Sequence, residues 1–231
     1  MSRKIILDSV DSTMTEAARR APDLEEPTWI MARHQSAAKG RQGRNWAMGA
    51  GNFAATLVTE VEVREAALRS FAASLALRTA LDRLGVEGLA LKWPNDVLVR
   101  GGKAAGILLE MLPGNRLAIG FGVNLRHAPD ASDVEDGAVR PVALDLDVRP
   151  EDFLDVLAES YDIWEATFQR EGFGPLREVW LSHAARLGEP IRARTVREEH
   201  YGTFETIDND GRLVLSTPQG TVTVAAADVF F

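Results

Sequence analysis

The sequence predicts an α+β protein in two parts: a larger domain of helices and strands, followed by a small β-barrel. Residues 1–186 mix runs rich in β-branched residues with runs that have helical spacing. After Gly188 the pattern changes to short β runs separated by the turn sequences NDG and PQG. Several short strands in close succession are typical of a small barrel. We therefore place the domain boundary near 186–189 and expect domains at 1–186 and 187–231.

Helices are expected in four places of the larger domain. The first begins within 9–20, where Asp11, Ser12 or Thr13 can cap it and Glu16 stands three residues after Thr13. Apolar residues at helical spacing predict the other three, at 65–84, 151–170 and 175–187. Gly85 follows the second helix directly, as expected of a residue that ends a helix.

Strands are expected where apolar and β-branched residues alternate or form short runs. These segments are 28–33, 52–63, 89–99, 103–111 and 117–125. The last three are joined by the sequences RGG and PGN, whose glycine and asparagine suit tight turns. Residues 128–140 read as an acidic loop.

Composition excludes several classes of protein. The 231 residues carry a formal net charge of −8 and contain no cysteine, which rules out disulfides and thiolate metal sites. An acidic chain does not favour sequence-independent nucleic-acid binding, which needs a broad basic face. No window approaches the roughly 20 apolar residues of a spanning helix, and the N-terminal run is too short and acidic for a signal peptide. We therefore expect a cytoplasmic protein that binds neither membrane nor DNA.

The segment 37-AAKGRQGRNW-46 concentrates positive charge in this acidic chain. Gly40 and Gly43 are interleaved with Lys39, Arg41 and Arg44. Like charges this close repel unless water screens them or an anion lies between them. The segment is therefore either a solvated surface loop or a cradle for a small anionic ligand.

Two charged residues lie at the ends of predicted strands. In 91-LKWPNDVLV-99, Pro94 interrupts the strand and turns Asn95 and Asp96 out of the ladder. Asp96 is either part of a polar turn or a candidate base or magnesium ligand beside a buried strand. Lys103 follows two glycines, so it is either a surface hairpin lysine or a point charge aimed at a carboxylate or phosphate.

The segment 118-AIGFGVNL-125 has alternating glycines. Gly120 and Gly122 open the same face of a strand, which indicates either a β-bulge or a slot for a planar ligand, with Asn124 on the same face. Gly106 is another small residue that lets a ligand or backbone lie close. No dinucleotide fingerprint or P-loop is present, and no two of the four histidines have metal-ligand spacing.

Taken together, in this order, these segments resemble the biotin protein ligases. The resemblance covers nearly the whole chain and rests on DST at 11–13, Q-x-x-x-K-G-R-x-G-R-x-W at 35–46, KWPND at 92–96, K-x-A-G-I-L at 103–108 and G-x-G-V-N at 120–124. It implies a class II synthetase-like mixed sheet flanked by helices, with an SH3-like C-terminal barrel. The lipoate ligases share the catalytic fold, but their arginine- and glycine-rich motif ending in His-Asp is absent.

The resemblance implies a reaction in two steps. Biotin and MgATP give biotinyl-5′-AMP, and a lysine of the biotin carboxyl carrier protein, of the acetyl-CoA carboxylase type, then attacks it. No tightly bound cofactor is expected beyond these substrates and the activating Mg²⁺. The catalytic residues implied are Arg41, Lys103 and Asp96, with Asp96 either holding Mg²⁺ or deprotonating the acceptor lysine.

The resemblance also assigns binding residues. Those for biotin are Ser12, Thr13, Met14, Gln35, Lys39, Gly40, Arg41, Lys103, Gly106 and Gly120. Those for the nucleotide are Lys39, Arg44, Trp46, Asn95 and Asn124. Ala38 and Lys39 depart from the family's usual Gly-Arg, and Met14 stands where asparagine is frequent.

Some alternatives remain open at the level of sequence. DST begins at residue 11, which leaves no room for the DNA-binding helix-turn-helix of bifunctional members, so we expect a monofunctional ligase. The rivals are a ligase of the same fold acting on lipoate or octanoate, and a sensor that binds biotin or nucleotide without transfer. The oligomeric state is not determined, and a homodimer is possible.

Overall fold

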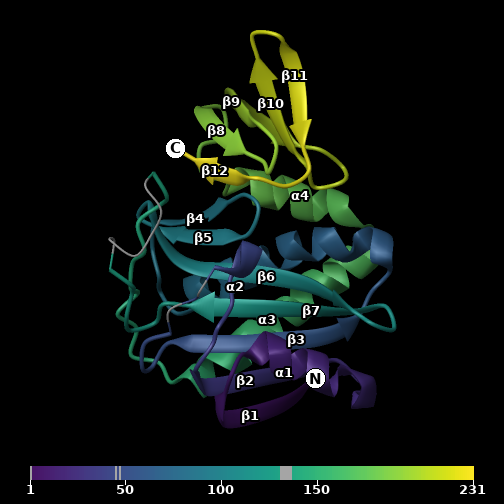
Figure 1. Ribbon diagram of the computed structural model, residues 1–231, viewed down its shortest axis with the longest axis vertical. Coiled ribbons are helices and arrows are strands. Elements are labelled where there is room, and N and C mark those ends of the chain that lie inside the picture. The colour runs from purple at the N-terminus through teal and green to yellow at the C-terminus, as the bar shows by residue number, and fades with distance from the viewer. Residues whose placement is uncertain (1, 45, 47, 131–136) are drawn as a thin grey trace.

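The structure is a computed structural model that describes residues 2–44, 46, 48–130 and 137–231. Its larger part is a seven-stranded sheet with helices on both faces, and a second, smaller sheet lies beyond one edge (Figure 1). Part of the predicted acidic loop, 131–136, lies outside the described residues. Among the helices that the structure describes, none is long and apolar enough to cross a membrane.

The large sheet is mixed, as predicted. Its strands run in the order β1-β2-β3-β7-β6-β5-β4. Their bounds are β1 (Arg3–Val10), β2 (Thr28–Gln35), β3 (Phe53–Glu60), β4 (Leu89–Lys92), β5 (Asp96–Val99), β6 (Gly102–Leu112) and β7 (Arg116–Val123). β1 and β2 are parallel, while every other neighbouring pair in this sheet is antiparallel.

Side-chain alternation along the strands builds one core on each face of this sheet. On β2, Trp29 packs toward the helices α2 (Arg69–Arg83) and α3 (Pro150–Glu171), whereas its neighbour Ile30 packs toward α1 (Thr13–Arg20). The larger core holds Trp29 against Phe121 and Tyr161. The sheet therefore buries α2 and α3 on one face and leaves the face of α1 to carry both that helix and a pocket (Figure 1).

Several predicted bounds were wrong. The structure has a first strand, β1, that was not predicted, and Ser9 and Val10 belong to it rather than to a helix. The segment 89–99 is two strands, β4 and β5, which pair with each other as a hairpin across the turn that contains Pro94. The predicted helix 65–84 begins as a 3₁₀ helix, η3 (Val63–Leu68), and α4 (Phe173–Ser182) ends five residues before the predicted end.

The C-terminal strands form a separate antiparallel sheet. They are β8 (Pro190–Arg194), β9 (Glu199–Ile207), β10 (Leu213–Thr217), β11 (Gly220–Val224) and β12 (Asp228–Phe230), in the order β11-β10-β9-β8-β12. The pairings of the described strands place β11 and β12 at opposite edges, so closure into a barrel is not confirmed. The exact boundary between the two domains also stays a prediction.

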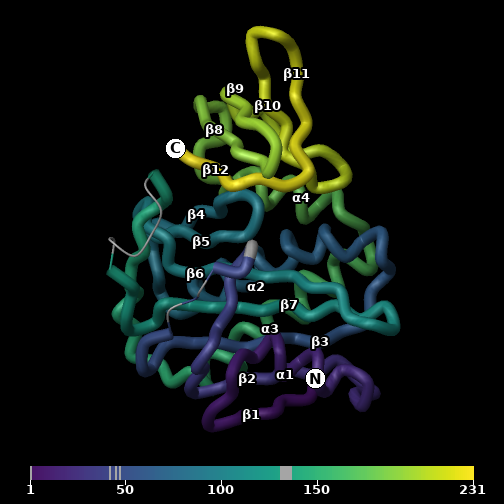
Figure 2. Tube along the Cα trace, in the orientation of Figure 1, coloured from purple at the N-terminus to yellow at the C-terminus, as the bar shows by residue number. Residues whose placement is uncertain are grey.

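Contacts between the two sheets bring the end of the chain to the larger domain. The indole Nε1 of Trp93 donates to the carbonyl of Gly211 at 3.1 Å, and the guanidinium of Arg177 on α4 donates to the carbonyl of Ile207. Figure 2 shows the trace of β12 running beside β4 and β5, with the C-terminus at the same end. The last strand therefore reaches the rim of the pocket described below.

Candidate active site

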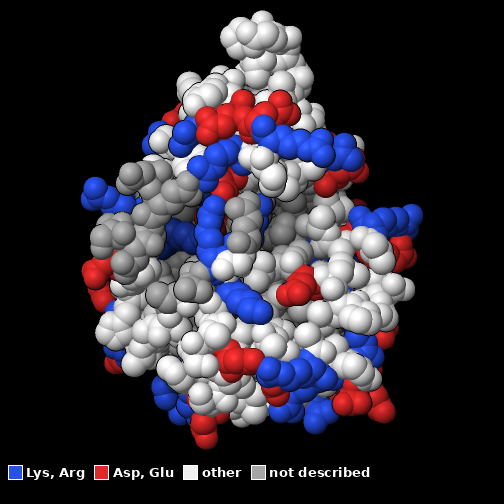
Figure 3. Space-filling view, in the orientation of Figure 1, with Lys and Arg blue, Asp and Glu red and all other residues white. Residues whose placement is uncertain are grey.

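One cavity of about 710 Å³ gathers every residue that the sequence predicted for the site. It lies over β6 and β7, between the loop 38–46 and β12, and a hollow with Lys and Arg side chains across its mouth is visible in Figure 3. The predicted residues that line it are Ser12, Thr13, Met14, Gln35, Lys39, Gly40, Arg41, Arg44, Trp46, Asn95, Asp96, Lys103, Gly106, Gly120 and Asn124.

The glycines on β6 and β7 form the floor of this cavity. Gly106 and Gly122 are cross-strand partners, and the register of β7 with β3 and β6 is unbroken through Gly120 and Gly122. The alternative that these glycines mark a β-bulge was therefore wrong.

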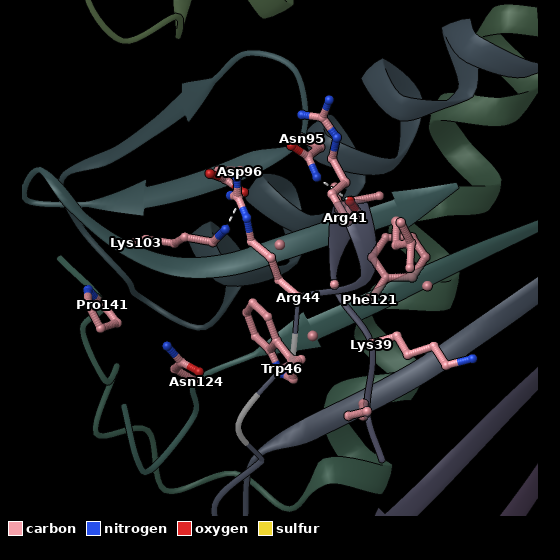
Figure 4. A pocket seen from close by; sticks show the side chains of 18 of the residues that line it. Lys39, Arg41, Arg44, Trp46, Asn95, Asp96, Lys103, Phe121, Asn124 and Pro141 are labelled. Atoms are coloured by element: carbon pink, nitrogen blue, oxygen red, sulfur yellow. Dashed lines mark hydrogen bonds and ion pairs between the residues drawn. The ribbon is translucent and has the colours of Figure 1, made fainter. Parts of the chain in front are cut away.

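The floor is nevertheless not bare in this structure. A Cβ built on Gly122 would come within 2.6 Å of the ring of Trp46, and one on Gly120 within 2.7 Å of the sulfur of Met14. The slot thus accepts a flat group, and here that group is the indole of Trp46 (Figure 4).

A carboxylate and two lysines stand at one end of the floor. Lys103 Nζ lies 2.7 Å from Asp96 Oδ1, and Lys92 Nζ lies 3.6 Å from Asp96 Oδ2. The sequence analysis did not name Lys92 as a site residue, although Lys92 is the first residue of the KWPND motif. Lys103 points to Asp96 in the pocket (Figure 4), so its alternative as a surface hairpin lysine was wrong.

The electrostatics of this cluster keep Asp96 ionised. Burial raises the pKa of its carboxyl group, but the charges of Lys103 and Lys92 outweigh burial, and the net pKa is lower than usual. For Lys92, burial lowers the pKa of the amine more than Asp96 raises it. Asp96 is therefore a buried carboxylate between the ammonium groups of Lys92 and Lys103.

The glycine-cation segment folds back on itself. The amide of Gly40 donates to the carbonyl of Arg44 at 2.7 Å, and the amide of Trp46 donates to the carbonyl of Ala38 at 3.0 Å. The turn between them is the 3₁₀ helix η2 (Arg41–Gly43), in which Gly43 has a φ of 73°. Lys39 is exposed, and in Figure 4 its ammonium points away from the Asp96 and Lys103 pair.

The two arginines of this segment meet an acid that the sequence did not single out. Arg44 Nη2 lies 2.5 Å from Asp228 Oδ2, and Arg41 Nη1 lies 4.0 Å from Asp228 Oδ1. Arg41 also donates to the carbonyl of Ala227 at 3.2 Å. No local pattern marks Asp228, because it stands 184 residues from Arg44.

A polar cluster lies at the opposite end of the floor, around the start of α1. The backbone amide of Thr13 donates to Gln35 Oε1 at 2.7 Å, and its hydroxyl oxygen lies 2.9 Å from that of Thr56. Thr56 on β3 is fully buried and was also missed by the sequence analysis. Thr56 therefore helps to fix Thr13, which lines the cavity together with Ser12 and Gln35.

The two predicted asparagines have partners in the backbone. Asn95 Nδ2 donates to the carbonyl of Ile107 at 2.5 Å, which ties the turn between β4 and β5 to β6. Asn124 Nδ2 donates to the carbonyl of Val142 at 3.2 Å. The side-chain oxygen of Asn124 is buried and has no hydrogen-bond partner within the described structure, so it is an acceptor that a ligand could satisfy.

The arrangement does not build a metal site from side chains. Among the described residues there is no group of three or more His, Asp or Glu that could hold an ion. Both oxygens of Asp96 face ammonium groups, which compete with any cation. The structure therefore does not favour the predicted role of Asp96 as a magnesium ligand.

Comparisons with known proteins identify the family of this chain. The biotin/lipoate A/B protein ligase family matches residues 6–124, and the biotin protein ligase C-terminal domain matches residues 187–231. The chain belongs to the biotin/lipoate A/B protein ligase family.

Within this family, the chain is similar over most of its length to proteins that are named as biotin ligases. It is 49% identical to a biotin–[acetyl-CoA-carboxylase] ligase of Paracoccus denitrificans, over 98% of this chain and 99% of that protein. A ligase of the same name from Mycobacterium tuberculosis is 32% identical over 87% of this chain and 77% of that protein. The biotin protein ligase of Aquifex aeolicus in complex with biotin and ATP has the same fold, with a TM-score of 0.87 at 20% identity over 99% of both chains.

Proposed function

We propose that this chain is an ATP-dependent biotin protein ligase that biotinylates the carrier protein of an acetyl-CoA carboxylase. The observation that supports it most is a single cavity with a polar end at Thr13 and Gln35, a flat glycine floor, and cations at the far end. Biotin has a polar ureido ring, an apolar thioether ring fused to it, and a side chain that ends in a carboxylate. The cavity offers a matching chemical group for each.

The first step joins two anions, the carboxylate of biotin and the α-phosphate of ATP. A carboxylate oxygen attacks the α-phosphorus, pyrophosphate leaves, and biotinyl-5′-AMP remains. Positive side chains reduce the repulsion between the anions and stabilise the charge that builds in the transition state. We assign this work to Lys103, Arg41 and Arg44, with Lys39 at the rim.

The second step transfers the biotinyl group. The amine of the carrier lysine attacks the carbonyl of the adenylate, a proton leaves that nitrogen, and AMP departs. Asp96 holds Lys103 in place by the 2.7 Å ion pair. Its ionised form is the form that accepts a proton, and this role toward the carrier lysine stays a prediction.

The nucleotide would arrive with Mg²⁺, which neutralises phosphate charge and is commonly held by phosphates together with one or two carboxylates. Because the ammonium groups beside Asp96 oppose a cation there, we assign the metal no ligand from this cluster. The side-chain oxygen of Asn124 is an acceptor for the nucleotide base in this proposal. A cytoplasmic location fits a reaction that consumes ATP.

The test is release of pyrophosphate from MgATP with biotin or with lipoate. We expect biotin-dependent release by the wild type, its loss in Lys103→Ala, and its retention in Lys4→Ala, a lysine that pairs with Asp155 outside the cavity. Release of pyrophosphate with lipoate but not with biotin would show that the chain is a lipoate ligase of the same family. Binding of biotin without any release would support a sensor instead.

The second step is tested separately with an isolated carrier domain. We expect a mass increase of one biotinyl group on its lysine when biotin and MgATP are both present, and none when either is omitted. A modified lysine in a carrier domain of another biotin-dependent carboxylase, but not in that of acetyl-CoA carboxylase, would correct the acceptor that we propose.

A further inference from the structure

Asp228 is the side chain through which the C-terminal sheet enters the candidate active site. Its strand, β12, pairs with β8 through Asp228 with Arg194, Val229 with Ala193 and Phe230 with Arg192. Val229 and Phe230 are buried. The backbone under Asp228 is therefore fixed by a ladder on one side and by packing on the other.

The carboxylate of Asp228 is surrounded by guanidinium groups. Its Oδ2 lies 2.5 Å from Nη2 of Arg44 and 3.4 Å from Nη2 of Arg194, and its Oδ1 lies 4.0 Å from Nη1 of Arg41. The side chain of Asp228 is 14% exposed. Burial raises its pKa, but hydrogen bonds and charge from Arg44, with Arg41 and Arg194, lower it overall, so the group is ionised at neutral pH. The single negative charge of Asp228 is thus shared among three arginines, so net positive charge remains beside the cavity.

A guanidinium group has five N–H donors on more than one edge. An arginine that gives one edge to a carboxylate can therefore still present N–H groups to a phosphate. Arg41 is held by its hydrogen bond to the carbonyl of Ala227 and attracted by the charge of Asp228 4.0 Å away, and it also lines the cavity. A flexible side chain held in this way loses less conformational entropy when an anion binds.

From this geometry we propose that Asp228 is a positioning residue that holds Arg41 and Arg44 for the phosphates of the nucleotide. It rests on the proposed function, because it assumes that the nucleotide phosphates bind beside these arginines. The C-terminal sheet then takes part in adenylation through one carboxylate. The opposite possibility, that Asp228 competes with the phosphates for the arginines, gives the opposite result in the same experiment.

The experiment compares Asp228→Asn with Asp210→Asn in the full chain. Asp210 pairs with Arg212 at an exposed turn of the same sheet, so the control removes the same charge away from the cavity. Pyrophosphate release is measured with ATP varied at saturating biotin, and with biotin varied at saturating ATP. Direct ATP binding by calorimetry accompanies it, so the proposal is tested even if the wild type does not turn over.

We expect Asp228→Asn to raise the KM and the Kd for ATP about tenfold, the effect of losing one charge-assisted hydrogen bond. The KM for biotin should rise less than the KM for ATP, because of the two arginines only Arg41 is also expected at the biotin carboxylate, and Asp210→Asn should resemble the wild type. Asp228→Glu should recover part of the affinity. In the Arg44→Gln background, Asp228→Asn should have a smaller effect than in the wild type, because one of the arginines on which it acts is already missing.

The results that overturn the proposal are distinct. A lower KM for ATP in Asp228→Asn would show a competing anion, and an unchanged KM would show that the carboxylate does not serve the nucleotide. An equal rise in both KM values, or a full effect in the Arg44→Gln background, would show a general structural role. Failure of the proposed function would instead appear in the wild type, as absence of biotin-dependent pyrophosphate release.

Discussion

The glycine floor gives a prediction whose size follows from measured contacts. In Gly122→Ala the new Cβ would stand 2.6–2.8 Å from three atoms of the Trp46 indole. Ordinary contact begins at 3.4 Å, so the ring must withdraw by about 0.8 Å. An indole is rigid, so the whole ring must turn about its side-chain bonds or shift away from the strand. Overpacking of this kind costs about 1–3 kcal/mol.

Two other glycines provide the comparison. In Gly120→Ala the nearest atom is the sulfur of Met14 at 2.7 Å, and a methionine side chain relieves such a contact by rotation. In Gly174→Ala nothing lies within 4 Å, and alanine favours the helix α4. We expect the free energy of unfolding to fall most in Gly122→Ala, less in Gly120→Ala, and not at all in Gly174→Ala.

Urea unfolding checks the order of stabilities, and the KM values for ATP and biotin check the site. A Cβ on Gly122 stands on the floor whatever Trp46 does, so the KM for at least one substrate should rise in Gly122→Ala. If Gly122→Ala matched the wild type in both unfolding free energy and KM, the close packing of this floor against a flat group would be refuted.

Two further predictions concern the ends of the cavity. Thr56→Val removes the hydroxyl beside that of Thr13, so it should lower the free energy of unfolding by about 1 kcal/mol and raise the KM for biotin. Thr59→Val, on the same strand, is the control. Equal KM values for biotin in the two variants would contradict this role of Thr56. Burial raises the pKa of Asp96, but Lys103 and Lys92 lower it more, so the carboxyl group has a lower pKa in the folded state than in the unfolded state. The ionised carboxylate therefore stabilises the fold above the unfolded pKa near 3.9, and this stabilisation is lost as the pH falls through the lower folded pKa. Acid unfolding of Asp96→Asn should accordingly depend less on pH below about 4 than that of the wild type, and equal slopes would count against the ion pairs.

The cations, Asp96 and the glycines of the site were predictable because each belongs to a short motif with its own chemistry, whereas Ser12, Thr13, Met14 and Gln35 were assigned only through the family resemblance. Arg41 follows Gly40 in the loop after β2, Lys103 follows two glycines at the start of β6, and Gly120 and Gly122 alternate along a strand, so type and position are both visible locally. Short runs and partial alternation of apolar and β-branched residues also predicted most strands of the large sheet. The strand β1 was not predicted because it lies at the edge of the sheet, where its residues are exposed or only partly buried and need not follow an apolar pattern.

What the sequence alone determined is therefore the set of groups: cations, carboxylate, hydroxyls and a glycine floor. What only the tertiary structure decided is which of them meet. Asp228 faces Arg44 across 184 residues, and Thr56 meets Thr13 from another strand. Lys92 and Lys103 share Asp96 because the hairpin of β4 and β5 pairs with β6. Such partners follow from strand order and docking of the two sheets, which depend on long-range burial and leave no local pattern to read.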